Sequence, residues 1–238
     1  MMGNLAAWKK GVIDGIPIGL GYLSVSFSFG IIAATAGLHI IEAVMMSATN
    51  FTSAGQFAGV TLIASSALLM EMALTQFIIN SRYFLMSAAL SQKMDPKTSM
   101  VHRIIMAFGI TDEVFGVSVA VKGKLNPYYT YGVMSVALPG WTLGTFLGAY
   151  SGDLLPPSIV SALSIALYGM LLAVILPPAK GNNILSALII ISMVGSWLFS
   201  QVPYLQNISS GVKIILLTFI IAGIAAALFP VKGEARNG

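Results

Sequence analysis

The chain contains no cysteine and only two histidines, His39 and His102, in 238 residues. A disulfide framework needs paired cysteines, and zinc and iron–sulfur sites are built mainly from cysteine and histidine. The expected spans also lack the His-Glu-x-x-His and Gly-x-Ser-x-Gly patterns of metalloproteases and serine hydrolases. We therefore expect no metal site, no cofactor and no catalytic residues, and hence not an enzyme.

Charge is also scarce. Charged residues make up 8% of the chain and hydrophobic residues 57%, with a mean hydropathy of +0.88. No soluble domain of this size has such a composition. The formal net charge of +4 comes from Lys and Arg near the ends of apolar runs, where they suit anionic lipid headgroups better than nucleic acid. The composition predicts a multi-pass protein of the cell (inner) membrane.

The apolar runs predict an all-α polytopic fold with about seven spans plus a broken or re-entrant helix pair. We expect residues 1–238 to form one transmembrane domain with a tail at 1–15, a cytoplasmic loop at 91–103, a C-terminal tail at 230–238, and a cytoplasmic N-terminus. The expected spans are 16–37, 40–50 joined by a break to 57–66, 67–90, 104–120, 128–150, 158–176, 184–199 and 211–229.

A polar segment, Asn50–Gln56, separates two of these apolar runs. Backbone that breaks at bilayer depth survives where protein, water or a ligand satisfies its N–H and C=O groups, so such breaks usually line a site. Ser53 and Gln56 have capping-box spacing, which predicts a new helix near Ala54. Pro139-Gly140 marks either a second broken helix or a plain proline kink.

Ionised side chains inside spans need a partner or a function, because each costs roughly 2.5–3.5 kcal/mol near the bilayer centre. Asp112 and Glu113 lie within the expected span 104–120, and helical spacing would put Gly109 and Gly116 on the face of Glu113. This pattern fits a proton-binding or amine-binding site. The alternative is a solvated or salt-bridged corner at a helix end.

Two further charges, Glu71 and Arg82, lie in the expected span 67–90, where we assign them structural roles. Glu71 has no opposite charge nearby in sequence and is expected to mark an interface between two short helices. Arg82 needs an anion, for which the candidates in order are Asp112 or Glu113, a lipid phosphate reached by snorkelling, and a substrate carboxylate.

Polar side chains also recur along one face of the span 67–90. Asn80, Tyr83 and Ser87 follow Gln76 at i+4, i+7 and i+11, the spacing of neighbours on one helix face. This spacing predicts an ordered row of hydrogen-bonding groups.

Three motifs resemble the large, AzlC-type subunit of branched-chain amino acid exporters. They are NFTSAGQFA from Asn50, NSRYFLMSAAL from Asn80 and TDEVF from Thr111, in the family's order and spacing. The resemblance implies a multi-span secondary transporter that exports leucine, isoleucine, valine and often methionine. It also implies a small, separately encoded, multi-span partner subunit of the AzlD type. Members often carry Leu-Arg-His where this chain has Ser81-Arg82-Tyr83.

A zwitterionic amino acid needs N–H donors for its carboxylate, an acceptor for its ammonium and an apolar pocket for its side chain. We expect the helix start at Ser53–Gln56 to hold the carboxylate, Asn80 to add a hydrogen bond, and Asp112 or Glu113 to take the ammonium or the coupling proton. The full set of expected substrate-binding residues is Phe51, Thr52, Ser53, Gly55, Gln56, Asn80 and Phe115, with Phe57 as a further pocket wall. The alternative hypothesis is a passive channel or structural membrane subunit, in which buried polar groups only join helices.

Overall fold

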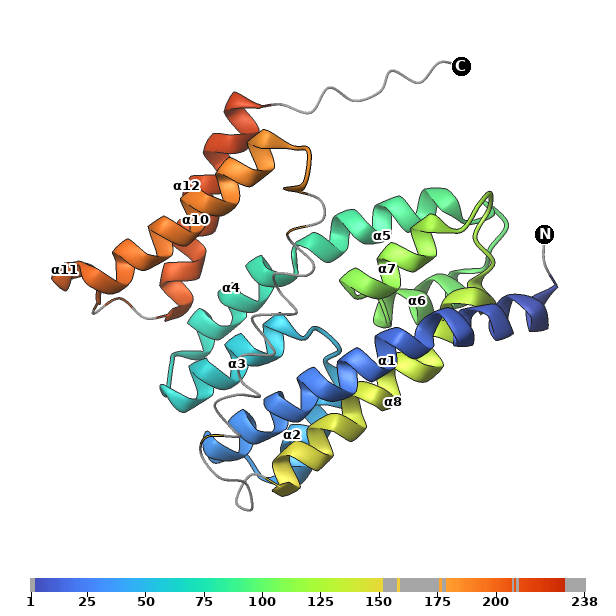
Figure 1. The fold of residues 1–238 in the computed structure, drawn as a ribbon, viewed down its shortest axis with the longest axis horizontal. Coiled ribbons are helices and arrows are strands. Elements are labelled where there is room, and N and C mark those ends of the chain that lie inside the picture. The colour runs from blue at the N-terminus through green and yellow to red at the C-terminus, as the bar shows by residue number, and fades with distance from the viewer. Residues whose placement is uncertain are drawn as a thin grey trace.

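The computed structural model describes residues 3–151, 179–206 and 210–229, together with residues 158, 176 and 208. These residues form an all-α membrane protein, as the sequence predicts (Figure 1). Among them, α1, α8 and α10 are each long and apolar enough to cross a membrane. The helices are α1 Asn4–Thr35, α2 Ile40–Thr49, α3 Ala54–Ala64, α4 Leu69–Asn80, α5 Arg82–Lys93, α6 Met100–Phe108, α7 Asp112–Ala120, α8 Pro127–Ser151, α10 Asn183–Gln201, α11 Pro203–Gln206 and α12 Ser210–Leu228.

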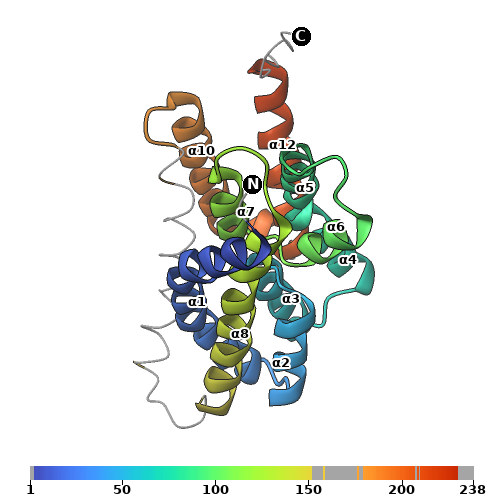
Figure 2. The same cartoon turned by 90° about the vertical axis from the view of Figure 1, so that its right-hand side faces the viewer.

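Helices α1 and α8 lie side by side and run in the same direction (Figures 1 and 2). Glycines bring their backbones together. A Cβ added to Gly11 would lie 2.0 Å from the carbonyl oxygen of Tyr129, and one added to Gly148 would lie 1.9 Å from that of Phe27. Small residues allow this close approach, which is typical of packed membrane helices. Helices α2, α3, α6 and α7 each contact one or both helices of this pair.

The first helical hairpin consists of α2 and α3. Helix α2 runs inward from the C-terminal end of α1, and α3 turns back, so that Gln56 hydrogen-bonds to Ser47 and a Cβ on Gly59 would meet the Met46 side chain. Ser47 also hydrogen-bonds to Thr145 of α8 over 2.7 Å, and Figure 2 shows α2 beside that end of α8. The expected broken pair is therefore a re-entrant hairpin, which we call hairpin 1.

The second hairpin corrects our prediction of one span at 104–120. Helix α6 runs inward, ends at Phe108, and α7 returns from Asp112 towards the same end of the molecule. His102 at the start of α6 lies 2.7 Å from the Tyr131 hydroxyl, and Ser118 near the end of α7 contacts Thr130, so both outer ends approach the start of α8. The chain turns back at residues 109–111, and this unit, hairpin 2, enters from the end opposite to hairpin 1.

The expected span 67–90 is also divided. A turn at Ser81 separates α4 from α5, because the Ser81 N–H bonds to the Ile78 carbonyl and the Phe84 N–H to that of Ser81, in place of the regular i→i−4 pattern. The two short helices together connect the outer end of hairpin 1 to that of hairpin 2 (Figure 1). Helix α12 packs against α4 and α3.

Pro139-Gly140 does not break its helix, since α8 is continuous from Pro127 to Ser151. The proposal of a second broken helix there is wrong, and the second break occurs in hairpin 2 instead. Close backbone packing supports α8 at this point, because a Cβ on Gly140 would lie 2.5 Å from the carbonyl oxygen of Gly19.

Helical structure extends further than expected at two places. Helix α1 begins at Asn4, inside the expected tail 1–15, and the expected loop 91–103 is reduced to residues 94–99 between α5 and α6. Nearly all of the predicted span 158–176, and the predicted tail 230–238, lie outside the described residues. The predicted spans 184–199 and 211–229 correspond to α10 and α12.

Within residues 3–151, every Lys and Arg except Arg82 lies at one end of the fold. We call this the basic end; it contains the start of α1, the α5–α6 connection and the α7–α8 connection (Figure 1). The connections at the opposite end, residues 36–39 and 65–68, contain neither Lys nor Arg. The residues of the basic end are Lys9, Lys10, Lys93, Lys97, Arg103, Lys122 and Lys124.

Candidate functional site

The inner tips of the two hairpins meet between α1, α8 and the α4–α5 turn. Tyr22, near the middle of α1, contacts both tips: its ring lies edge-to-face against Phe51 of hairpin 1, and its hydroxyl oxygen lies 2.6 Å from Thr111 Oγ1 of hairpin 2, within hydrogen-bond distance. Trp141 of α8 packs edge-to-face on the same tyrosine, with ring centroids 5.3 Å apart. The site therefore lies far from both ends of the long helices.

Polar side chains from α4 and α5 form hydrogen bonds with the tip of hairpin 1. The Thr52 hydroxyl donates to Asn80 Oδ1 and accepts from the Tyr83 hydroxyl over 3.2 Å. Gln76 donates through Nε2 to the Gly55 carbonyl over 2.7 Å and accepts from Asn80 Nδ2 over 3.2 Å. Three members of the polar row predicted for the span 67–90 thus contact the break: Gln76 bonds to its backbone, and Asn80 and Tyr83 bond to the Thr52 side chain.

Ser53 is the backbone turning point of hairpin 1. It has φ 39°, a region that favours glycine, and it precedes α3 as its N-cap residue. The predicted helix start at Ala54 is correct, but the predicted capping box is absent because the Ser53 side chain makes no cap hydrogen bond.

Gln56 points away from the predicted capping partner. Its amide donates to Ser47 Oγ over 3.0 Å and its carbonyl oxygen accepts from Trp141 Nε1 over 2.8 Å, and the residue is fully buried. These contacts tie α3 to α2 and α8. In this conformation Gln56 joins helices and does not face an open site.

The tip of hairpin 2 carries the two acidic residues. Thr111 is the N-cap of α7 and its Oγ1 accepts from the Val114 N–H, so Asp112 and Glu113 occupy the first turn, where the helix dipole favours negative charge. Glu113 accepts a hydrogen bond from the Tyr22 hydroxyl. The break also corrects the predicted helix face, because Gly109 precedes α7 and its flank is filled by Met134.

Arg82 joins the turn between α4 and α5 to hairpin 2. Its Nη1 lies 2.5 Å from Asp112 Oδ2, which confirms the first-ranked partner for this arginine. The pair is partly covered, with side-chain exposures of 33% for Arg82 and 20% for Asp112. The Nε of Arg82 is buried without a hydrogen-bond partner. A buried guanidinium donor therefore stays available beside an acidic group of the opposite sign.

The remaining predicted residues divide between site and core. Phe51 lies in the aromatic cluster with Tyr22 and Trp141, whereas Phe57 packs edge-to-face on Phe29 in the core. Phe115 is partly buried against the core. Glu71 lies in the first turn of α4 at the end opposite to the basic end, away from the hairpin tips.

Sequence reasoning missed Tyr22, Thr111 and Trp141. Tyr22 and Trp141 are single aromatic residues in apolar, glycine-containing runs, and nothing in such a run distinguishes a site residue from core. Thr111 did carry a signal, because Thr followed by two acidic residues is a typical start of a helix.

These features define the class: an all-α membrane protein with a charged site between two re-entrant hairpins. The sequence model of the family described as "AzlC protein" matches residues 17–155. The chain therefore belongs to the AzlC family, membrane proteins of the branched-chain amino acid exporter family. The match includes both hairpins, the whole of α8 and the part of α1 from residue 17 onward.

Individual relatives are named as membrane proteins. The chain is 34% identical to an uncharacterized membrane protein of Archaeoglobus fulgidus over 76% of this chain and 80% of the relative. It is 26% identical to the inner membrane protein YgaZ of Escherichia coli over 94% of this chain and 90% of the relative. It is also 26% identical to an uncharacterized membrane protein of Helicobacter pylori over 63% of this chain and 66% of the relative. No solved structure matches the chain.

Proposed function

We propose that this protein is a secondary transporter that exports the branched-chain amino acids leucine, isoleucine and valine, with methionine as a further substrate. The observation that carries the proposal is the pair of opposite charges, Arg82 and Asp112, held where two hairpins from opposite ends meet. Broken helices at mid-depth are the usual setting of substrate sites in secondary transporters.

The Arg82–Asp112 pair has the same two charges as a zwitterionic amino acid. A substrate that enters between them would place its carboxylate on the guanidinium and its ammonium on Asp112, exchanging one ion pair for two. The buried Nε of Arg82 supplies a donor that the internal pair leaves unused. Because guanidinium binds carboxylate through paired donors, this exchange orients the α-carbon of the substrate.

Neighbouring residues complete this proposed site. Thr52 and Asn80 hydrogen-bond to each other at the tip of hairpin 1 and can turn to the substrate carboxylate or ammonium. Phe51, which packs on Tyr22, and the partly buried Phe115 are the proposed apolar walls for an aliphatic side chain. Aliphatic substrates gain about 0.8 kcal/mol per CH₂ buried, which favours larger side chains over alanine.

Glu113 is the proposed proton carrier. It lies next to Asp112 and accepts from the Tyr22 hydroxyl, so its negative charge contributes to the field around the substrate ammonium. Protonation of Glu113 would remove this charge and weaken the hold on the ammonium. Proton binding and substrate release would then be coupled through one carboxylate.

The location and the partner are also part of the proposal. We assign the protein to the inner membrane, the location printed in the name of its relative YgaZ. Helix α10 has no buried residue among those described and exposes Ile190, Met193 and Trp197. Such a surface suits lipid or a small hydrophobic AzlD-type subunit, and we propose that this subunit is required for transport.

Efflux of labelled leucine from preloaded vesicles tests the proposal. The chain alone is compared with the chain plus the small subunit, with and without an imposed pH gradient. Saturable efflux that the gradient accelerates and that needs both chains is expected. Leak that ignores the gradient would instead indicate a passive channel, and the absence of flux for every aliphatic amino acid would contradict the proposed substrate class.

A further inference from the structure

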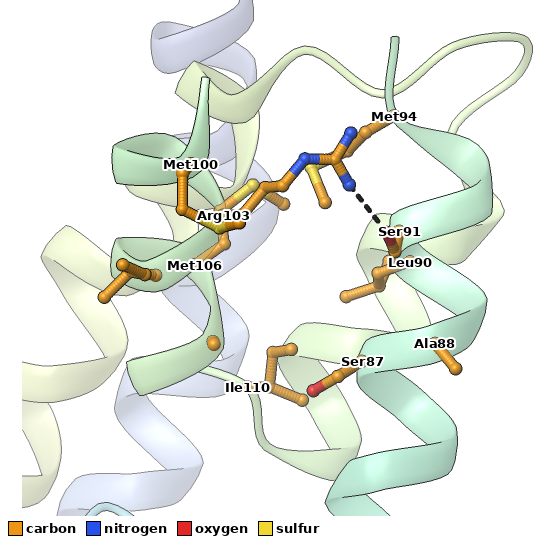
Figure 3. A pocket seen from close by; sticks show the side chains of 11 residues that line it. Ser87, Ala88, Leu90, Ser91, Met94, Met100, Arg103, Met106 and Ile110 are labelled. Atoms are coloured by element: carbon orange, nitrogen blue, oxygen red, sulfur yellow. Dashed lines mark hydrogen bonds between the residues drawn. The ribbon is translucent and has the colours of Figure 1, made fainter. Parts of the chain in front are cut away.

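A pocket lies between α5 and α6, at the basic end of the molecule. It has a volume of about 370 Å³ and is lined mainly by apolar side chains, among them Leu90, Met94, Met106 and Ile110 (Figure 3). Methionine is a flexible side chain that adapts to irregular apolar ligands. The pocket is separate from the Arg82–Asp112 pair, and the proposed transport function does not use it.

Arg103 is the charged residue of this pocket. Figure 3 shows its guanidinium at the end near Ser91 and Met94, with Ser87 and Ile110 at the other end. Nη1 donates to Ser91 Oγ over 2.6 Å, Nη2 to the Asp95 carbonyl over 3.2 Å and Nε to the Thr98 carbonyl over 3.3 Å.

All three acceptors of Arg103 are neutral. A guanidinium has five N–H donors, so donors remain for a further ligand. Among the residues that the structure describes, ion pairs join Lys10 to Asp14 and Arg82 to Asp112, and Arg103 forms none. Arg103 therefore has donors that no carboxylate contacts directly, and this favours an anion at the mouth of the pocket.

The surroundings of the pocket select the kind of anion. Lys93, Lys97 and Lys124 belong to the same basic end, which attracts anionic headgroups. On α6, Met100 and Ile104 line the pocket and are 69% and 63% exposed, so an apolar chain can reach it from the side. A soluble anion would find little to contact in such a lining.

We propose that this pocket binds an anionic phospholipid. Its phosphate would contact the free donors of Arg103, and one acyl chain would lie between α5 and α6 towards Ile110. Ile110 belongs to the break of hairpin 2 and directly precedes Thr111, the N-cap of α7. The bound acyl chain would therefore contact hairpin 2 next to its inner tip.

Native mass spectrometry of the detergent-purified full chain, titrated with phosphatidylglycerol or phosphatidylcholine, tests this site. The parent is expected to retain one phosphatidylglycerol with about tenfold preference over phosphatidylcholine, the effect of one charge-assisted contact. Arg103→Gln should abolish the preference. Lys97→Gln, a charge removal at the same end outside the pocket lining, should leave it within about twofold.

A second variant separates binding from folding, because Arg103 also ties down the α5–α6 connection. Ala88→Leu fills the pocket from an exposed position of α5 and leaves the contacts of Arg103 in place. It should weaken retention of both lipids without lowering the unfolding temperature in detergent. Equal binding of the two lipids by the parent, unchanged retention in both variants, or displacement of the lipid by glycerol phosphate would each overturn the proposal.

Discussion

Arg82 connects the α4–α5 turn to hairpin 2 through a single carboxylate, Asp112. Loss of either partner leaves the other charge partly buried and unpaired. For a fully buried pair such a loss costs roughly 3–5 kcal/mol, and the partial exposure of this pair lowers the expected cost. The pair is therefore expected to contribute less to stability than a fully buried pair would.

Arg82→Gln and Asp112→Asn are each expected to reduce leucine efflux at least about tenfold, because each removes one of the two charges that would receive the zwitterion. The measurement is initial efflux at matched amounts of folded protein in vesicles. Lys97→Gln, a charge removal distant from the hairpin tips, is the control. Parent-like efflux from both variants would exclude the pair from substrate binding.

Gly55 is a second sensitive position. A Cβ there would lie 2.7 Å from Gln76 Oε1 and 2.7 Å from Thr52 Cγ2, inside the network that satisfies hairpin 1. Gly55→Ala should cost about 1–3 kcal/mol, as overpacking usually does, and should also reduce efflux. Gly116→Ala is the matched control, because a Cβ at Gly116 meets nothing within 4 Å. Thermal unfolding in detergent and leucine efflux in vesicles are measured for both glycine variants.

At the scale of elements, the contact between α1 and α8 depends on glycine at particular positions. Gly148→Ala should force the two helices apart, since its Cβ would meet the Phe27 carbonyl, and the unfolding temperature should fall by several degrees or more. Gly21→Ala is the control on the same pair, because Gly21 lies on an exposed part of α1 with open space around it. If both variants unfold at the same temperature, close backbone contact is not what holds the pair.

Hairpin 1 is anchored to α8 through Gln56. Gln56→Leu would leave the buried Trp141 N–H without its acceptor, at a cost of about 1–3 kcal/mol. A lower unfolding temperature is the expected result. Gln92→Leu, a change of the same type near the basic end where the side chain is exposed, should have little effect.

The elements differ in how well the sequence predicts them. Hairpin 1 was predictable because its break is a run of polar residues between apolar segments. Hairpin 2 was missed because its break, Gly109 to Thr111, is short, and the helix start at Thr111-Asp112-Glu113 is its one local signal. The turn at Ser81 likewise occupies one residue, which is too short to interrupt a hydropathy pattern.

The site shows the same division. The Arg82–Asp112 pair could be predicted because a charge at bilayer depth needs a partner, whereas its contacts with other helices depend on tertiary packing. Sequence spacing suggested that Gln56 caps its own helix, but the fold brings Ser47 and Trp141 within its reach. Local patterns thus predicted which residues are polar and buried, and the fold determined their partners.

For the whole molecule, the basic end predicts orientation. Short loops rich in Lys and Arg stay in the cytoplasm, so the start of α1 and the α5–α6 and α7–α8 connections should face that side. The chain contains no cysteine, so single-cysteine variants can be made directly. A membrane-impermeant thiol reagent added to intact cells should label Ser65→Cys, and Lys97→Cys should react after permeabilisation. The reverse pattern would invert the topology.

Two hairpins that turn back at half depth also determine where the membrane voltage falls. Because the helices of each hairpin end at its tip, we expect the largest part of the voltage to fall around the tips, near Tyr22, Phe51 and Trp141. One elementary charge that crosses the full potential changes its energy by about 2.3 kcal/mol per 100 mV. A zwitterion has no net charge, so its transport would carry no current. A proton carried by Glu113 would produce current. Electrical recording would therefore count the coupling ions directly.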